Sequence, residues 1–223
     1  MNYIFGRSKL ADLFLKDLEV VSETNFNVSV YPVVDREYHV QGFSIFEDVV
    51  EYAKLILCAE HINMYLPIGY KVPGLKREKY KKCKEARIST PSLIAEKLHG
   101  KQLRIQEASW IMPKAVVGHF SNIGIGVTLW SGCNLSHHCS VGDFSWISPQ
   151  AVILGEASIG SDCFIGAGSI IGEGVTVGNG CFIGAGAILT KNLPPDSIAL
   201  DGKNNIESTN NADHVKYLYG RLK

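Results

Sequence analysis

Apolar residues recur with a period of six in the second half of the chain. Every sixth position from residue 105 to residue 189 is Ile, Leu or Val, and glycine often follows it. A small residue, usually Ala, Ser or Cys, comes four positions after all but the last of these aliphatic residues. A helix needs a period near 3.6 and a lone strand a period of about 2, so neither explains the pattern. It predicts short parallel strands wound into a prism, with one aliphatic side chain pointing inward on each face.

Residues 1–86 lack this repeat and alternate between strand-like and helix-like segments. We expect strands at 2–5, 28–34 and 62–68, and helices at 8–18, 44–54 and 75–86. This alternation predicts a small α/β domain with a parallel sheet. The chain then divides into residues 1–86, a repeat domain over 87–192, and a tail over 193–223 that ends in a short helix at 211–222.

Charge and length limit the function classes. The 223 residues carry 22 basic and 22 acidic side chains, so nucleic acid or an anionic membrane is not expected as the main partner. No uncharged apolar run reaches about 18 residues, which predicts no membrane span. The first residues lack the basic and apolar regions of a signal peptide, so we expect a cytoplasmic protein.

Four of the six cysteines occupy the small position of the repeat, namely Cys133, Cys139, Cys163 and Cys181. We interpret them as small apolar residues at tight corners rather than as metal or redox groups. Cys58 and Cys83 lie outside the repeat, and no cysteine pairs with them at metal-ligand spacing, so no metal site is expected.

The tandem [LIV]-G-x-x-[small]-x repeats resemble those of the hexapeptide-repeat acyltransferases. The resemblance implies a left-handed parallel β-helix with three hexapeptides per coil, and a homotrimer with active sites between subunits. An α/β domain before the repeats resembles the sialic-acid O-acetyltransferase and nucleotide-sugar N-acetyltransferase family. The fold class implied is therefore an N-terminal Rossmann-like domain followed by a left-handed β-helix.

In that family, the loop after the first strand holds the nucleotide-sugar. Here this loop is Gly6-Arg7-Ser8-Lys9, and the residues after the second strand are Asp35 and Arg36. The family's Ile-Gly pair at the third strand is present as Ile68-Gly69. The resemblance assigns substrate contacts to Ser8, Lys9, Asp35, Arg36 and Gly69. The alternative is a packing domain with a plain turn.

Three histidines could carry chemistry. His119 and His137 are separated by one full coil, so they should stack on neighbouring coils of one face, with His138 beside them. The segment from Leu135 to Asp143 resembles the family's active-site coil, which implies that His137 is the general base. A neutral imidazole suits that role, and a second histidine nearby disfavours its protonation. Solvated surface histidines are the alternative reading, above all for His119, which we place with the substrate.

Two further residues belong to this picture. The family has a glutamate after its catalytic histidine, but His138 stands there, and Glu156, one coil further along the chain, could orient it. Gly155 lies one coil beyond His137, where the resemblance implies a backbone N–H that binds the oxyanion. The alternative for Gly155 is a plain corner glycine.

The resemblance places acetyl-CoA, as co-substrate, against Trp146, Ala167 and Ala185. Trp146 also belongs to a column with Trp110, Phe164 and Phe182, which occupy the same position on other coils, so it could instead be part of an aromatic ladder at a boundary.

We therefore expect an acetyl-CoA-dependent acetyltransferase acting on an amino or hydroxyl group of a sugar, nucleotide-linked, in surface glycan or polysaccharide synthesis. Two alternatives remain at this point. One is a non-catalytic trimeric binding or assembly protein. The other is a zinc hydratase of the carbonic anhydrase kind, which needs three converging histidines.

Overall fold

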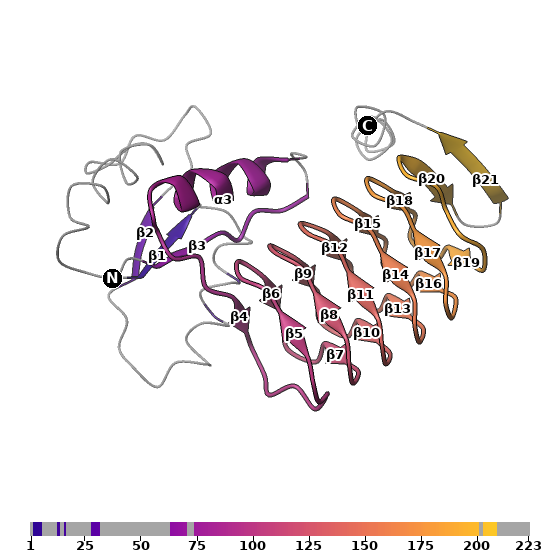
Figure 1. The fold of residues 1–223 in the computed structure, drawn as a ribbon, viewed down its shortest axis with the longest axis horizontal. Helices are drawn as coiled ribbons and strands as arrows, with labels where there is room; N and C mark the ends of the chain where they lie inside the picture. The colour runs from indigo at the N-terminus through magenta and orange to yellow at the C-terminus, as the bar shows by residue number, and fades with distance from the viewer. Residues whose placement is uncertain are drawn as a thin grey trace.

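The computed structural model describes residues 2–5, 13, 16, 28–31, 63–70, 74–200 and 203–208. Two parts follow one another along the chain, a small parallel sheet with one helix and a long stack of coils (Figure 1). The helices expected over 8–18, 44–54 and 211–222 lie outside the described residues, apart from the single positions 13 and 16.

The stack is the parallel β-solenoid that the six-residue period predicts. From residue 104 on, a two-residue strand begins at every sixth position. The strands are β5 (Arg104–Ile105), β6 (Trp110–Ile111), β7 (Val116–Val117), β8 (Asn122–Ile123), β9 (Thr128–Leu129), β10 (Asn134–Leu135), β11 (Ser140–Val141), β12 (Trp146–Ile147), β13 (Val152–Ile153), β14 (Ser158–Ile159), β15 (Phe164–Ile165), β16 (Ile170–Ile171), β17 (Thr176–Val177), β18 (Phe182–Ile183) and β19 (Ile188–Leu189). The expected partial first coil is present as β4 (Leu93–Ile94), which pairs with β6.

Three parallel sheets form the faces of the prism. Sheet 1 contains β7, β10, β13, β16 and β19, and sheet 2 contains β5, β8, β11, β14 and β17. Sheet 3 contains β4, β6, β9, β12, β15 and β18, and continues into β20 (Ser197–Leu200) and β21 (Lys203–Ser208). Paired residues occupy the same position on neighbouring coils, as in Leu135 opposite Ile153. We call the turns from sheet 1 to sheet 2 the histidine edge, those from sheet 2 to sheet 3 the helix edge, and those from sheet 3 to sheet 1 the alanine edge.

The core is the column of aliphatic side chains inside the prism. From Ile111 to Ile183, every sixth residue is at most 3% exposed. Each such side chain contributes roughly 1.5–3 kcal/mol through burial. Because these contacts repeat from coil to coil, the stack holds the edge residues in a fixed register.

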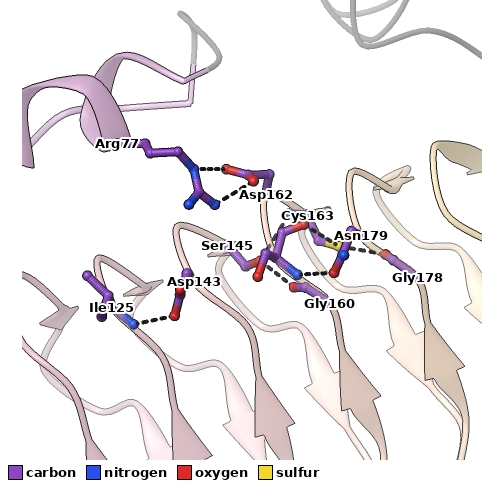
Figure 2. A network of polar contacts seen from close by, with 10 residues as sticks. Arg77, Ile125, Asp143, Ser145, Gly160, Asp162, Cys163, Gly178 and Asn179 are labelled. Atoms are coloured by element: carbon purple, nitrogen blue, oxygen red, sulfur yellow. Dashed lines mark hydrogen bonds and ion pairs between the residues drawn. The ribbon is translucent and has the colours of Figure 1, made fainter. Parts of the chain in front are cut away.

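The small residues fill the corners, as predicted. The four repeat cysteines are buried and unpaired. The Cys163 thiol donates to the Gly178 carbonyl at 3.1 Å (Figure 2). Burial raises the pKa of Cys133 to about 12, so this thiol stays protonated. The geometry supports the packing interpretation.

The N-terminal part contains β1 (Asn2–Phe5), β2 (Val28–Tyr31) and β3 (Asn63–Tyr65), in the order β2-β1-β3 and all parallel. The parallel sheet is therefore confirmed. The third strand is shorter than expected and ends before Pro67, which has no N–H to donate to a neighbouring strand. The expected third helix is present as α3 (Leu75–Glu85).

Helix α3 lies against the helix edge. Arg77 forms an ion pair with Asp162 at 2.6 Å (Figure 2). Its guanidinium also lies 4.3 Å from the centre of the Phe144 ring. Lys84 forms an ion pair with Glu107 at 2.9 Å. Polar contacts across two distant segments thus fix α3 on the solenoid. Within the described residues, no helix is both long and apolar enough to cross a bilayer.

Candidate functional site

The histidine edge brings the predicted catalytic residues together. His119 follows β7, His137 follows β10 and Gly155 follows β13, each two residues after an inward aliphatic side chain. The strand register aligns these three positions on successive coils. All three histidines of this edge are exposed, whereas Gly155 is buried.

The His137 imidazole lies directly beside Gly155. A Cβ placed on Gly155 would be 2.7 Å from Cε1 and 2.9 Å from Nε2 of His137. Real Cβ atoms do not approach other atoms so closely, so only glycine leaves the ring in this position. The role of Gly155 thus includes making room for the imidazole.

The Gly155 N–H is also available to donate a hydrogen bond to a ligand. On the helix edge, two of the equivalent amides are bound by side chains from the next coil. Asp143 Oδ1 accepts from the Ile125 N–H at 2.9 Å, and Asn179 Oδ1 accepts from the Ser161 N–H at 2.8 Å (Figure 2). For the Gly155 N–H, the described part of the chain provides no hydrogen-bond acceptor.

His138 contacts His137 directly. The two Nδ1 atoms are 3.1 Å apart, so one ring donates to the other, and the ring planes are 82° apart. His138 has a φ of +58°, which is uncommon for a residue other than glycine. Its N–H donates to the His119 carbonyl at 2.8 Å.

His119 faces away from this pair. Its Nδ1 accepts a hydrogen bond from the Lys101 N–H at 3.1 Å, on the preceding coil. This bond requires an unprotonated Nδ1, so a neutral His119 carries its proton on Nε2. His119 therefore presents a donor, rather than a base, to the solvent.

The expected contact of Glu156 is not found. The Glu156 N–H donates to the His137 carbonyl at 2.9 Å, which fixes the two coils relative to each other. Over the residues that the structure describes, no hydrogen bond joins the Glu156 carboxylate to either imidazole.

One ring at this edge was missed by the sequence reasoning. Phe120 stacks on His138, with ring centres 4.7 Å apart and planes 19° apart. Phe120 stands one coil before His138, so the spacing that located Gly155 could also have located Phe120.

The residues predicted to hold acetyl-CoA lie elsewhere on the prism. Ala167 and Ala185 are exposed on the alanine edge, after β15 and β18. Trp146 lies on sheet 3 and is only 7% exposed, because Tyr70 covers it at 5.1 Å between ring centres. Within one chain, the structure therefore does not bring these three residues to His137. The ring contacts of Trp146 are with Tyr70 and Trp130.

Four of the predicted substrate residues, Ser8, Lys9, Asp35 and Arg36, lie outside the described residues. Gly69 is described and is partly buried after β3. Its neighbour Tyr70 packs on Trp146 and Phe164, which joins the N-terminal part to sheet 3. In the described ranges, no group of three or more His, Cys, Asp or Glu side chains is arranged to hold a metal ion.

The repeat matches a known family model. The model is described as bacterial transferase hexapeptide (six repeats), and it matches residues 138–173 and 156–191. These ranges include His138, Gly155 and both predicted alanines.

Solved structures share the fold over nearly the whole chain. PerB from Caulobacter crescentus, in complex with CoA and GDP-perosamine, is 20% identical and has a TM-score of 0.77, over 92% of this chain and 96% of that one. The acetyltransferase domain of PglB from Neisseria gonorrhoeae is 21% identical with a TM-score of 0.77, over 93% and 98%. WeeI from Acinetobacter baumannii is 16% identical with a TM-score of 0.77, over 94% and 99%. Residues 138–191 therefore match the hexapeptide-repeat model, and the chain has the fold that these structures share.

Proposed function

We propose that the chain is an acetyl-CoA-dependent acetyltransferase that acts on an amino or hydroxyl group of a nucleotide-linked sugar. The observation that carries this proposal is the His137 imidazole beside the unbonded amide of Gly155. A base and an N–H donor at one position are what acyl transfer from a thioester requires. The fold shared with PerB, whose structure holds CoA and GDP-perosamine, supports the same reaction class.

In this proposal, His137 Nε2 accepts the proton of the attacking amine or hydroxyl while the new C–N or C–O bond forms at the thioester carbonyl. The Gly155 N–H donates to the oxygen that becomes negatively charged. The C–S bond then breaks, and the proton leaves with the sulfur as the free CoA thiol. His119 Nε2–H is a donor for a polar group of the substrate.

The site requires more than one copy of the chain, and we propose a homotrimer. The histidine edge and the alanine edge are different edges of one prism, so one copy supplies His137 and a neighbouring copy supplies Ala167 and Ala185. The outer face of sheet 1, between these edges, is apolar apart from Asn134, and no described residue of the chain packs over its two exposed ends. Its Val116 is 54% exposed and its Ile188 is 62% exposed. Uncovered apolar surface of this kind is typical of protein interfaces.

The parts of the chain have separate roles in the proposal. Residues 1–86 form a Rossmann-like domain that holds the nucleotide-sugar, with contacts from Ser8, Lys9, Asp35, Arg36 and Gly69. Residues 87–192 form a left-handed β-helix that carries the chemistry, and residues 193–223 complete it. The parallel order of β1, β2 and β3 supports this division. The product is a precursor of surface glycans.

The test is thiol release from acetyl-CoA with a panel of UDP- and GDP-linked amino and deoxy sugars. We expect turnover with one member, and a rate at least about 10²-fold lower for His137→Ala, as for loss of a general base. His99→Ala is the matched control, because His99 is exposed and forms no hydrogen bond or ring contact with any of the three imidazoles. Binding of acetyl-CoA without turnover on any sugar would overturn the proposal in favour of a binding protein, and stoichiometric zinc would favour a hydratase.

A further inference from the structure

Three side chains on the prism edges bind an amide of the preceding coil. Asp143, Asn179 and His119 all accept from the N–H at the equivalent position one coil before them. His137 occupies the same position in the repeat, but its Nδ1 faces His138 Nδ1 at 3.1 Å instead. At His137, the interaction with His138 therefore takes the place of a hydrogen bond to the amide of the preceding coil.

The orientation of His138 depends on Phe120. The two residues occupy the same position on successive coils, with φ angles of +61° for Phe120 and +58° for His138. Stacking at 4.7 Å between ring centres covers one face of His138 and restricts its ring plane. Equivalent corner residues on other coils, such as Glu156 and Asp162, share this positive φ. Each corner is fixed by an N–H bond to the preceding coil, which for Phe120 goes to the Lys101 carbonyl at 2.9 Å.

When both rings are neutral, one proton lies between the two Nδ1 atoms, so one ring donates a hydrogen bond and the other accepts it. The hydrogen bond made by one ring nitrogen decides which nitrogen carries the proton. If His137 donates from Nδ1, its lone pair is on Nε2, the nitrogen that lies against Gly155. That is the nitrogen which the proposed reaction needs unprotonated.

We propose that Phe120 is a positioning residue. By stacking on His138, it holds His138 Nδ1 as the acceptor for the Nδ1–H of His137, and so keeps the lone pair of His137 on Nε2. The direction of the proton rests on the proposed function, whereas the dependence on Phe120 rests on geometry alone. In this chain, the stacked His138 imidazole thus accepts the hydrogen bond from His137 that a glutamate would otherwise accept.

The test is histidine-selective ¹⁵N NMR of the full-length protein near neutral pH, because protonated and bare ring nitrogens have separate resonances. The His137 signals are assigned by their loss in His137→Gln. We expect a protonated Nδ1 and a bare Nε2 in the unmodified protein. Phe120→Ala should lose this pattern, and Phe120→Tyr, which keeps a stacking ring, should restore it.

Two further variants separate positioning from folding. Phe120→Leu keeps apolar bulk without a flat ring, so it should lose the pattern even if Phe120→Ala fails to fold. Phe144 also has a positive φ, but it lies on the helix edge and its ring contacts Tyr80 rather than an imidazole. Phe144→Ala should therefore leave the pattern unchanged. In the thiol-release assay, we expect kcat of Phe120→Leu to fall about 10-fold, less than for loss of the base itself, with little change in the KM for acetyl-CoA.

The outcomes are distinct. A bare Nδ1 on His137 in the unmodified protein, or an unchanged pattern in Phe120→Leu, would overturn this inference. The expected pattern without turnover on any sugar would leave the inference standing and defeat the proposed function.

Discussion

The hydroxyl of Tyr80 on α3 donates to the Glu107 carboxylate at 2.9 Å. Lys84 and Thr90 donate to the same carboxylate at 2.9 Å and 2.8 Å. Burial by itself would raise the pKa of Glu107, but these three donors outweigh it and hold the pKa below its usual value. Because the folded-state pKa is depressed, the stabilisation is present above the unfolded pKa near 4.3 and is lost as the pH falls through the folded value.

We expect Glu107→Gln to lower the free energy of unfolding at pH 7 by about 1 kcal/mol, since the group is partly exposed and solvent screens it. The acid-induced decrease in stability below about pH 4 should also become shallower. Thermal unfolding from pH 3 to pH 8 measures both effects. Equal loss of stability with pH in the variant and the parent would contradict this account.

Whereas the charged form of Glu107 stabilises the fold, the charged form of Lys76 destabilises it. Its ammonium group is buried, with Thr128 Oγ1 at 3.3 Å, and desolvation lowers its pKa to about 7. The unfolded chain therefore binds more protons between about pH 7 and its unfolded pKa near 10.4, so this group makes the protein more stable as the pH rises through that range.

We expect Lys76→Met to raise the free energy of unfolding at pH 7 by about 1 kcal/mol or more, because an apolar side chain of similar length has no such desolvation cost. The variant should also lose part of the rise in stability above pH 7. Denaturant unfolding at pH 7 and pH 9 measures the difference. A variant that is less stable at both pH values would show that the Thr128 contact outweighs desolvation.

Gly155 offers a separate test of the site. Its φ is not in the left-handed region, so alanine is conformationally allowed, but the new Cβ would displace the His137 ring. We expect Gly155→Ala to lower kcat by about 10²-fold, the effect of misplacing a reacting group by roughly 1 Å. Its unfolding free energy should change by less than about 1 kcal/mol, because surface side chains can adjust at little cost.

Gly118→Ala is the matched contrast for that experiment. Its Cβ would meet the backbone of Ser136 at 2.5 Å, which cannot move without distorting the coil. This variant should therefore lose stability as well as activity. Loss of stability in Gly155→Ala on the same scale would show that the glycine is structural.

The proposed trimer can be tested on sheet 1. We expect Ile188→Glu to shift the protein from trimer to monomer in light scattering and to abolish thiol release, because a carboxylate would be buried at the interface. Thr176→Glu is the control, since Thr176 is exposed on the polar outer face of sheet 2. A trimeric Ile188→Glu protein would place the interface elsewhere.

The period of six located every short strand from β5 to β19, because each inward aliphatic side chain occurs once per face. The spacing of one coil also predicted that His137 lies beside Gly155, because residues one coil apart occupy neighbouring positions on parallel strands in register. These features depend only on local repetition, which a single sequence displays.

The contacts between distant segments were not visible in the sequence. Arg77 and Asp162 are 85 residues apart, and no pattern in either segment indicates the other. Tyr70 on Trp146 is a similar case. The turn of His137 toward His138 is a choice of rotamer, which register does not determine. By contrast, the Phe120 ring that stacks on His138 stands one coil before it, a spacing that the sequence displays.

The strand β21 runs antiparallel to β20 at the far end of sheet 3. A solenoid that stopped at a parallel strand would present an open edge on which another molecule could add strands and extend into a filament. The reversed strand occupies that edge with backbone of opposite direction. A parallel strand of another molecule therefore cannot continue the stack directly on β20.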